Sequence, residues 1–302
     1  MKKAAFVAVV GRPSAGKSTL VNILCGAKVA IVSAVPQTTR NAIRGIYSGP
    51  PGQLVFVDTP GRHASEKKLN KKLIEVSERA LEDAELVLYV MDASRAPASE
   101  EEAVAQRLIP LAERTIVAIT KMDIPSADYE RALSFIQEKL PGVPVLRCFK
   151  VSSFNKEGTA VLLDKLFEMA PEGEPMYPED HYTDQEITFR IAEIIREKAM
   201  NRLREELPHS IYVEVADAEL RPDPTDSYGS KKRLWVRAFI IAERESQKGM
   251  IVGKGGELIK AIRLSALKDL KRIFDWKIDL DLRVKTGKDW RQNDRVLRKI
   301  TG

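Results

Sequence analysis

A glycine-rich segment near the start of the chain has the residue types and spacing needed to bind phosphate groups. It runs Gly11-Arg12-Pro13-Ser14-Ala15-Gly16-Lys17-Ser18-Thr19 and follows an apolar run over residues 4–10. The glycines let backbone N–H groups surround phosphate oxygens, and a helix start adds its positive dipole end. Lys17 would neutralise the β- and γ-phosphates, and the Ser18 hydroxyl would coordinate Mg²⁺. A plain glycine turn is the alternative, which the strand–loop–helix context disfavours.

A second segment, Asp58-Thr59-Pro60-Gly61, could contact the terminal phosphate and its metal ion. Asp58 ends an apolar run, where a carboxylate can hold Mg²⁺ through a water molecule or merely cap a turn. Gly61 would donate its N–H to the γ-phosphate, so loss of that phosphate would release the segment after it. Gln37-Thr38-Thr39-Arg40 offers one more hydroxyl to the metal, with Thr39 preferred to Thr38 and a solvated threonine as the alternative. The predicted metal ligands are Ser18, Thr39 and Asp58, and the predicted catalytic residues are Lys17, Thr39 and Gly61.

A third segment, Thr120-Lys121-Met122-Asp123, could recognise a base. The two Asp123 oxygens can accept hydrogen bonds from the N1–H and the exocyclic amine of guanine, whereas adenine lacks this donor pair. Lys121 would lie along the base and brace the phosphate loop, and Val151-Ser152-Ser153 would add a backbone contact to the base oxygen. Asp123 alone could be an ordinary surface carboxylate. The order and spacing of the three segments favour binding and hydrolysis of a guanine nucleotide, GTP to GDP, with Mg²⁺.

A second glycine-rich segment lies in the C-terminal part and could bind single-stranded nucleic acid. Gly253 and Gly256 form a Gly-x-x-Gly pattern between two predicted helices, and Lys254 would offer a counter-charge to a closely approaching backbone. Ile251, Val252 and Ile259 could line a groove for unstacked bases or could belong to the core. The predicted RNA-binding residues are Ile251, Val252, Gly253, Lys254, Gly255, Gly256, Ile259 and Lys260.

The net charge of +6 lies entirely in the C-terminal part of the chain. Residues 1–180 hold 23 basic and 23 acidic residues, whereas residues 231–302 hold 20 and 9. A basic block behind a neutral domain favours a polyanionic partner. Individually these are ordinary surface charges, but together they predict salt-dependent RNA affinity. The residues near the glycine turn are Lys231, Lys232, Arg233, Lys248, Lys260, Arg263, Lys268, Lys271 and Arg272.

Composition excludes several classes of protein. The chain is 44% hydrophobic and 30% charged, which is typical of a globular protein, and no apolar run reaches the length of a membrane span. Cys25 and Cys148 are far apart and have no second ligand nearby, so a reducing cytoplasm fits better than disulfides or a metal–thiolate site. The lysines and apolar residues at the start read as a first strand rather than a secretory signal, because the phosphate loop follows at once.

The first half of the chain alternates apolar runs with helical periodicity, which predicts an α/β fold with a mostly parallel sheet and helices on both faces. The predicted strands are residues 4–10, 54–58, 86–92, 115–120 and 143–151. The predicted helices are residues 17–25, 70–83, 100–113, 129–140 and 159–169. Residues 31–46 read as a long functional loop that leads into an edge strand.

Three prolines and several acidic residues between residues 171 and 178 mark a linker. After it we predict a helix over 184–207, strands over 210–216 and 233–242, a short helix, the glycine turn, a helix over 257–274 and a strand over 277–285. This α-β-β-α-α-β order predicts an α+β domain. A further basic helix over 290–300 could flank the RNA groove or pack on the domain. The predicted domains are residues 1–170 and 184–302, joined by a linker over 171–183.

Five segments, GRPSAGKS, QTTR, DTPG, TKMD and VSS, resemble the five nucleotide-binding motifs of translation-factor-type GTPases of the P-loop class. Thr120 stands where Asn is usual, and we expect guanine selectivity to survive this change. Ser153 replaces Ala, a minor difference. Arg62 stands where many such enzymes place a water-orienting Gln, so intrinsic hydrolysis should be slow and should depend on another group.

The same motifs, together with IVGKGG in an order of helices and strands similar to that of a type II KH domain, resemble the Era family. The resemblance implies a bacterial GTPase that binds the 3′ end of small-subunit ribosomal RNA, assists maturation of the small ribosomal subunit and changes its domain arrangement with nucleotide state. It also implies a cytoplasmic protein in peripheral contact with the inner membrane. Lys67, Lys68, Lys71 and Lys72 could make that contact or form a solvated helix face. Ser14 replaces the Asn to which monovalent-cation activation is attributed, so that property is not carried over. We expect a monomer that does not bind DNA.

Other functions were weighed against this one. An RNA-binding chaperone with little hydrolysis would fit a damaged pocket, yet Lys17, Ser18 and Asp58 are all present. Asp123 and the lack of a second helicase-type domain disfavour an ATP-using kinase or helicase. A tRNA-modifying GTPase would need a reactive C-terminal cysteine, and no cysteine follows Cys148.

Overall fold

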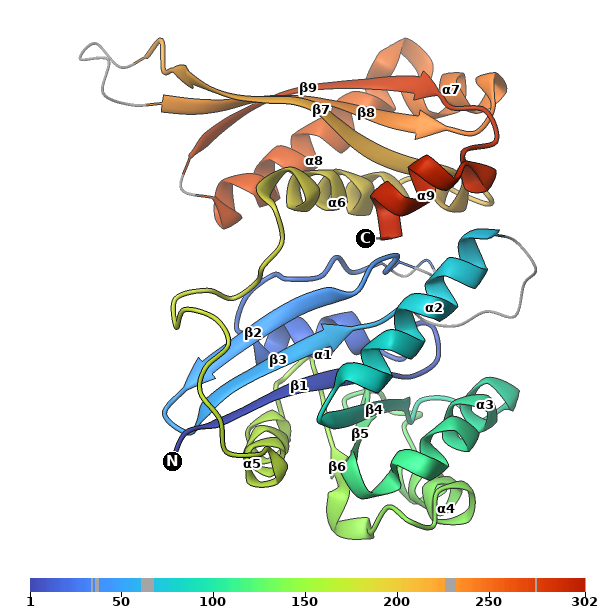
Figure 1. Ribbon diagram of the computed structural model, residues 1–302. Coiled ribbons are helices and arrows are strands. Elements are labelled where there is room, and N and C mark those ends of the chain that lie inside the picture. The colour runs from blue at the N-terminus through green and yellow to red at the C-terminus, as the bar shows by residue number, and fades with distance from the viewer. Residues whose placement is uncertain (34, 36–37, 61–67, 226–231, 275, 302) are drawn as a thin grey trace. The chain divides into compact units, whose positions relative to one another are not determined.

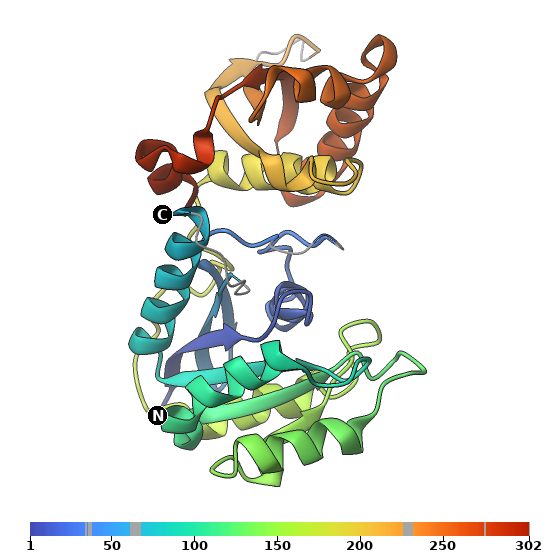
Figure 2. The same cartoon turned by 90° about the vertical axis from the view of Figure 1, so that its right-hand side faces the viewer.

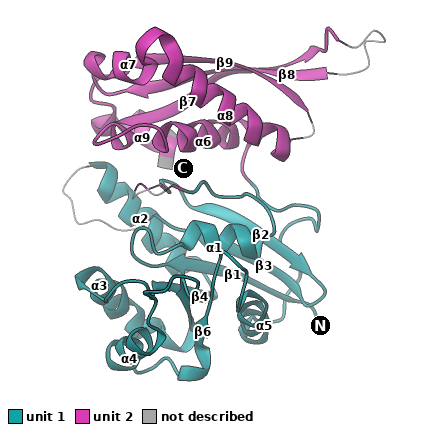
Figure 3. Cartoon of the chain, turned by 180° about the vertical axis from the view of Figure 1, so that it is seen from behind, with its two compact units in different colours: residues 1–32, 39–184, 301–302 teal, residues 33–38, 185–300 magenta. Residues whose placement is uncertain are grey.

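A computed structural model describes residues 1–302 except 34, 36–37, 61–67, 226–231, 275 and 302. The chain divides into two compact units (Figure 3). Unit 1 comprises residues 1–32, 39–184 and 301–302, and unit 2 comprises residues 33–38 and 185–300. None of the helices in the described part of the chain is long and apolar enough to cross a membrane.

Unit 1 is built around a six-stranded, mostly parallel sheet (Figure 1). Its strands are β1 (Lys3–Val10), β2 (Ile43–Gly49), β3 (Gly52–Asp58), β4 (Leu86–Asp92), β5 (Thr115–Thr120) and β6 (Cys148–Lys150). They lie in the order β2-β3-β1-β4-β5-β6, and the edge strand β2 runs antiparallel to β3. Every residue of β3, β4 and β5 is buried, as expected for strands covered on both faces.

Helices cover both faces of this sheet. They are α1 (Lys17–Leu24), α2 (Lys68–Asp83), α3 (Ser99–Leu108), α4 (Tyr129–Lys139) and α5 (Thr159–Met169). Alternate residues of β4 point to opposite faces, so Leu88 packs in the core under α1 and α5, and Tyr89 in the core under α3 and α4. Figure 2 shows the layers from the side, with α1 and α2 on opposite sides of the strands.

Two predicted elements of unit 1 are shorter than expected. The helix predicted over 100–113 ends at Leu108 and continues as a 3₁₀ helix, η1 (Ile109–Arg114), because Pro110 cannot donate an α-helical hydrogen bond. The strand predicted over 143–151 is only β6, preceded after Pro144 by a 3₁₀ helix, η2 (Val145–Arg147). The apolar run was therefore a poor guide to the strand's start, and Leu146 is 83% exposed.

The proline-rich segment predicted as a linker is held against unit 1 by Gln53. The Gln53 Oε1 accepts hydrogen bonds from the backbone N–H groups of Met176 (2.8 Å) and Tyr177 (2.9 Å), and its Nε2 donates to the Tyr177 carbonyl (2.8 Å). Asp184 pairs with Arg44 of β2 at 2.8 Å. Residues 171–183 therefore belong to unit 1 in the structure, and the division between the units follows Asp184.

Unit 2 has a three-stranded sheet in the order β7-β8-β9, in which β7 and β8 are antiparallel and β8 and β9 are parallel. Its α-helices and strands are α6 (Ile187–Met200), β7 (Ile211–Pro222), β8 (Lys232–Ala242), α7 (Glu245–Val252), α8 (Glu257–Ile273), β9 (Lys277–Thr286) and α9 (Asp294–Thr301). Its 3₁₀ helices are η3 (Pro208–Ser210), η4 (Lys254–Gly256) and η5 (Trp290–Gln292). Residues of α6 and α8 pack on one face of the sheet. The predicted α-β-β-α-α-β order is confirmed.

Element lengths in unit 2 also differ from the prediction. The helix predicted over 184–207 is only α6, and the chain after it turns through Glu205 at a φ of 54° before Pro208. The strand predicted over 210–216 continues to Pro222 through an irregularity between Val215 and Asp217. The C-terminal helix is η5 followed by α9. Trp290 is buried and donates through Nε1 to the Ser210 carbonyl at 3.0 Å, so this segment packs on the domain.

Candidate functional site

The phosphate loop connects β1 to α1 and has a backbone that few residue types adopt. Gly11, Ser14 and Gly16 have φ values of 152°, 60° and 100°. A Cβ atom at Gly11 would lie 2.3 Å from the Val90 carbonyl oxygen, so only glycine fits there. Gly16 precedes α1, whose first turn has no side-chain cap. The loop therefore presents helix-start N–H groups without a competing side-chain acceptor, as phosphate binding requires.

Lys17 lies across the inside of this loop. Its Nζ donates to the carbonyl oxygens of Gly11 and Arg12, both at 2.9 Å. Burial lowers the Lys17 pKa to about 8, although Asp58 opposes this shift. Among the described residues, this buried ammonium donates hydrogen bonds to neutral carbonyl groups, and a phosphate would compensate its charge better.

The three predicted metal ligands come together. The Ser18 hydroxyl donates to Asp58 Oδ2 at 2.6 Å, the Thr39 hydroxyl lies 3.2 Å from the same oxygen, and the two hydroxyl oxygens are 3.1 Å apart. Thr38 instead donates to the Val35 carbonyl at 2.8 Å. The structure therefore brings Thr39, the preferred threonine of the prediction, to Ser18 and Asp58.

The surroundings of Asp58 fit a bound cation. Its carboxylate is fully buried, and Oδ1 has no hydrogen-bond partner among the described residues. Burial raises the Asp58 pKa, while Lys17, Ser18 and Thr39 act in the opposite direction. A buried oxygen without a partner is costly. Two hydroxyls and one carboxylate form an all-oxygen set of the kind that Mg²⁺ prefers, so the residues present fit this ion.

The rest of the second segment is described only in part. Thr59 donates to the Val9 carbonyl at 2.8 Å, and the Pro60 carbonyl accepts from Ser77 of α2 at 3.0 Å. These contacts anchor the segment to β1 and α2. Gly61 and Arg62 lie outside the described residues. The predicted contact of Gly61 with a γ-phosphate therefore stays a prediction.

Thr120 links the base-reading segment to the phosphate loop. Its hydroxyl lies 2.9 Å from the Ala15 carbonyl and 3.1 Å from the Met91 carbonyl, so its single proton can serve either acceptor. Thr120 thus bonds the phosphate loop although it stands where Asn is usual. This contact supports the expectation that base selectivity survives the replacement.

Asp123 is exposed and is oriented by the segment after β6. Its Oδ1 accepts from the Ser152 hydroxyl at 2.6 Å, and the Ser152 oxygen accepts in turn from the Phe154 N–H at 3.2 Å. Met122 N–H donates to the Val151 carbonyl at 3.3 Å. Ser153 follows directly in this turn. The third segment and residues 151–153 therefore lie together, and a carboxylate oxygen retains capacity to accept from a base.

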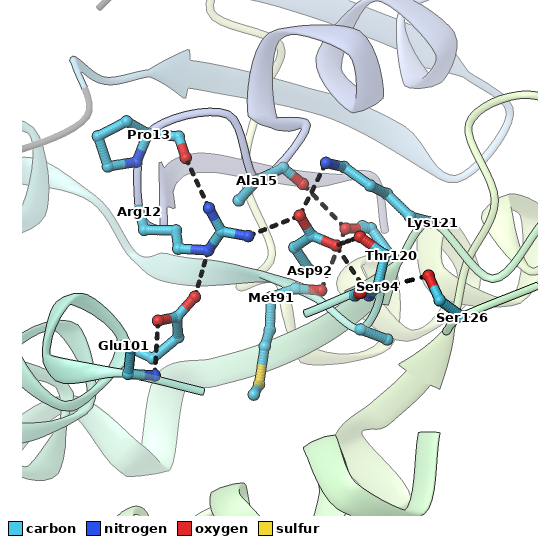
Figure 4. Close-up of polar contacts among 12 residues, drawn as sticks. Arg12, Pro13, Ala15, Met91, Asp92, Ser94, Glu101, Thr120, Lys121 and Ser126 are labelled. Carbon is cyan, nitrogen blue, oxygen red and sulfur yellow. Dashed lines mark hydrogen bonds and ion pairs between the residues drawn. The ribbon is translucent and has the colours of Figure 1, made fainter. Parts of the chain in front are cut away.

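Sequence reasoning missed two acidic residues of this region and the role of the Arg12 side chain. Arg12 is buried and pairs with Asp92 at the end of β4 and with Glu101 of α3, while its Nη1 donates to the Pro13 carbonyl at 3.2 Å (Figure 4). The guanidinium is thus engaged within the protein, and any contact of Arg12 with phosphate would come from its backbone. Asp92 ends a buried apolar strand as Asp58 does, and this shared pattern could have drawn attention to it.

The Gly-x-x-Gly turn lies between α7 and α8. Gly253, Gly255 and Gly256 have φ values of 75°, 59° and 79°. A Cβ atom at Gly253 would lie 2.7 Å from the Leu258 Cβ, whereas Gly255 and Gly256 face open space. Lys254 is exposed, so this backbone is accessible beside a positive charge. These are the features that a closely approaching nucleic-acid backbone needs.

The predicted RNA-binding side chains beside the turn differ in how deeply they are buried. Lys260 is exposed, and Val252 and Ile259 are half-buried. Ile251 is fully buried in the core of unit 2, so the prediction that it lines a groove is wrong. It is the buried residue of α7 and packs in the core of unit 2 just before the turn.

Some of the predicted basic residues form ion pairs or hydrogen bonds within the protein, and others are exposed. Arg233 pairs with Asp223 and Asp279, Lys248 pairs with Glu245 at 3.2 Å, and Arg263 donates to the Leu280 carbonyl at 2.6 Å. Lys231 lies outside the described residues. The exposed members are Lys232, Lys260, Lys268, Lys271 and Arg272.

Comparison with known proteins agrees with both halves of this description. Residues 6–121 match the family model described as a 50S ribosome-binding GTPase, and residues 206–291 match that of the KH domain. The GTPase Era of Treponema denticola is 48% identical over 98% of each chain. The GTPase Era of Borreliella afzelii is 40% identical over 99% of each chain.

Solved structures show the same relationship. A variant of Aquifex aeolicus Era bound to GDP and AlF4⁻ matches with a TM-score of 0.89 at 34% identity, over 98% of each chain. An Era complex with MgGDPNP and nucleotides 1506–1542 of 16S ribosomal RNA matches with a TM-score of 0.90 at 34% identity, over 99% of this chain and 98% of that one. The predicted fold class, a P-loop GTPase domain with a KH domain, is therefore confirmed. This chain belongs to the Era family of GTPases.

Proposed function

We propose that this GTPase is a switch that binds the 3′ end of small-subunit ribosomal RNA through its KH domain and assists maturation of the small ribosomal subunit. One observation carries the proposal. A phosphate loop, an all-oxygen metal site and a base-reading carboxylate occur in the same chain as an accessible Gly-x-x-Gly turn. An Era relative that matches over nearly the whole chain was solved with MgGDPNP and nucleotides 1506–1542 of 16S ribosomal RNA, which supports the nucleotide-binding and RNA-binding parts of this assignment.

In the proposed reaction, residues of unit 1 hold GTP and stabilise the charge that develops on the transferred phosphoryl group. Lys17 would leave its two carbonyl partners and contact the β- and γ-phosphates. Ser18, Thr39 and Asp58 would hold Mg²⁺, which neutralises charge on the phosphate oxygens when bound. Asp123 would accept from guanine. Arg62 stands where many such enzymes place a water-orienting Gln, so we expect slow intrinsic hydrolysis.

The metal assignment predicts a specific effect of Asp58→Asn. The amide keeps the shape of the carboxylate but lacks its charge, so Mg²⁺ binding should weaken about 10- to 100-fold. The half-saturating Mg²⁺ concentration for GTP turnover should rise by the same factor. GDP binding measured in EDTA serves as the control and should change little. An unchanged Mg²⁺ dependence would rule out Asp58 as a metal-site residue.

For RNA, we propose that the backbone of the glycine turn contacts the ribose-phosphate backbone and that a lysine pairs with a phosphate. Gly255 and Gly256 leave open space over the turn, and the start of α8 follows it directly. A ribose-phosphate chain could approach this surface closely, and Lys254 would neutralise one phosphate. Nucleotide state would then alter the arrangement of the two units, as the family resemblance implies.

The RNA assignment is tested by the double substitution Lys254→Asp and Gly255→Asp. Gly255 has open space and Asp tolerates its left-handed backbone better than most residues, so the fold should be kept. Retention of an RNA carrying the 3′ end of the small-subunit ribosomal RNA should fall at least about 10²-fold, because two negative charges would face the phosphates.

This variant is preferable to Gly253→Asp, whose Cβ would press on Leu258 and strain the turn. GTP turnover in the absence of RNA is the control and should remain within about twofold of the unsubstituted protein. RNA retention that survives the double substitution would place the RNA site elsewhere. An RNA chaperone with little hydrolysis is the second candidate, and it would bind RNA normally yet show no GTP turnover.

We further infer a cytoplasmic monomer, and we keep peripheral contact with the inner membrane as a proposal. The lysine cluster offered for that contact includes Lys68 and Lys71, which are exposed on α2. Lys72 pairs with Glu75 at 3.1 Å. Lys67 lies outside the described residues. Co-sedimentation with anionic lipid vesicles tests the contact: a loss on replacing Lys68 and Lys71 with Glu would support it, and the absence of binding would leave a solvated helix face.

A further inference from the structure

Four charged side chains of unit 1 form a row of ion pairs between the phosphate loop and the base-reading segment (Figure 4). Glu101 pairs with the Nε of Arg12, the Arg12 Nη2 lies 2.6 Å from Asp92 Oδ2, and the same Asp92 oxygen lies 2.7 Å from Lys121 Nζ. The charges alternate in sign along the row. Asp92 is therefore shared between one residue of the phosphate loop and one of the base-reading segment.

The Asp92 carboxylate is held in a single orientation. Its side chain has 0% exposure, and its other oxygen, Oδ1, accepts from the backbone N–H of Ser94 at 2.9 Å and from the Ser94 hydroxyl at 2.5 Å. Burial acts to raise the Asp92 pKa, but hydrogen bonds from Lys121 and Ser94 outweigh it and the pKa is lowered. The group therefore stays ionised at neutral pH, with every oxygen engaged.

Sheet topology explains why Asp92 reaches both segments. β4 lies between β1 and β5, and Asp92, its last residue, is in register with Thr120. The phosphate loop follows β1 and Lys121 follows β5, so both loops leave the same edge of the sheet as Asp92. Lys121 has a φ of 64°, a conformation that non-glycine residues adopt at a cost. Its ion pair with Asp92 offsets part of that cost.

The geometry points to Asp92 as a positioning residue that holds Lys121 ready for the base and ties it to the phosphate loop through Arg12. This inference rests on the nucleotide site of the proposed function. The stem of Lys121 is expected to lie along the guanine ring, and an ordered stem loses less conformational freedom when the nucleotide binds. Asp92 touches no part of the nucleotide in this account. It acts through Lys121 and Arg12.

Asp92→Asn is the direct test, because the amide has the same shape and lacks the charge shared by the two cations. Release of a fluorescent GDP should become about 30-fold faster, the usual effect of removing one partner of a buried charge pair. Affinity for pyrophosphate should change less than about threefold, because pyrophosphate reaches only the phosphate loop and Arg12 keeps Glu101. On a Lys121→Met background, Asp92→Asn should accelerate release less than about threefold, because the residue through which it acts is gone.

Glu101→Gln is the matched control, since it breaks the same row of ion pairs at the end remote from Lys121. It should lower the melting temperature yet change GDP release less than about threefold. Ser94→Ala removes one hydrogen bond to Asp92 and should accelerate release about threefold to fivefold, which decides the matter if Asp92→Asn does not fold.

Three results would overturn the inference: equal losses for GDP and pyrophosphate, equal effects of Asp92→Asn and Glu101→Gln, or an undiminished effect on the Lys121→Met background. Failure of the proposed function would give a result different from these three. It would appear as an unsubstituted protein that binds no GDP.

Discussion

Replacing Lys17 with alanine is expected to lower GTP turnover at least about 10³-fold. Lys17 is the buried cation of the phosphate loop, and its ammonium donates to the Gly11 and Arg12 carbonyl oxygens. A preorganised cation on transferring phosphoryl oxygens is worth about 10³- to 10⁵-fold in rate. Single-turnover release of phosphate from GTP at saturating protein measures the chemical step separately from binding.

The substitution should leave the rest of the molecule intact, because Lys17 belongs to neither hydrophobic core of unit 1. An unchanged melting temperature would show that unit 1 stays folded, and retention of RNA reports on unit 2 and should be unchanged. Lys71→Ala, on the exposed face of α2, is the matched control for loss of a lysine and should keep full turnover. Turnover by Lys17→Ala within about tenfold of the unsubstituted protein would overturn the assignment of the loop.

Replacing Asp123 with asparagine is expected to reverse base preference. The carboxylate could accept two hydrogen bonds from guanine, whereas the amide would present a donor to the ring and leave one of them unmade. Xanthine carries an oxygen at C2, which suits that donor. Affinity for GTP should fall about 10²- to 10³-fold, and affinity for xanthosine triphosphate should rise by a similar factor. Equilibrium titration with both nucleotides measures the change.

Ser152→Ala separates base recognition from mere orientation of the carboxylate. It removes the hydroxyl that donates to Asp123 at 2.6 Å but keeps the acceptor pair. The affinity for GTP should fall only about fivefold, and the affinity for xanthosine triphosphate should not rise. Unchanged GTP affinity in Asp123→Asn would exclude the base-reading role, and a gain for xanthosine triphosphate in Ser152→Ala would show that Asp123 is not the discriminating group.

The nucleotide groups could be predicted from sequence because each belongs to a short segment at the end of a strand. Lys17 and Ser18 follow β1, Asp58 ends β3, and Asp123 follows β5. The carboxyl ends of parallel strands meet at one edge of the sheet, so identifying the strands was enough to bring the segments together. The glycine turn was predictable from its Gly-x-x-Gly spacing and from the periodicity of α8 after it, which buries Ile262, Ala266 and Leu270.

The supporting contacts could not be predicted, because they join residues that share no local pattern. Arg12 and Asp92 are 80 residues apart, and Gln53 holds a segment 124 residues away. Nothing in the sequence around Glu101 distinguishes it from its acidic neighbours. Periodicity also could not separate the buried Ile251 from the half-buried Val252. Such features depend on tertiary packing, which overrides local propensity.

The ends of helices and strands were also predicted poorly from the sequence. Pro110 and Pro144 were visible in the sequence, and weighting them more heavily would have shortened one helix and one strand. The extension of β7 to Pro222 is exposed throughout, and these residues are ordered by pairing with β8 rather than by burial. Strand propensity is dominated by this kind of context.

The central claim is that one carboxylate reads guanine while the loop after β1 binds the triphosphate. Titration of the unsubstituted protein with GTP and ATP in the presence of Mg²⁺ tests it most directly. We predict that GTP binds at least about 10³-fold more tightly than ATP, because adenine would leave Asp123 without its donor pair. Equal or tighter binding of ATP, or no binding of either nucleotide, would contradict the account.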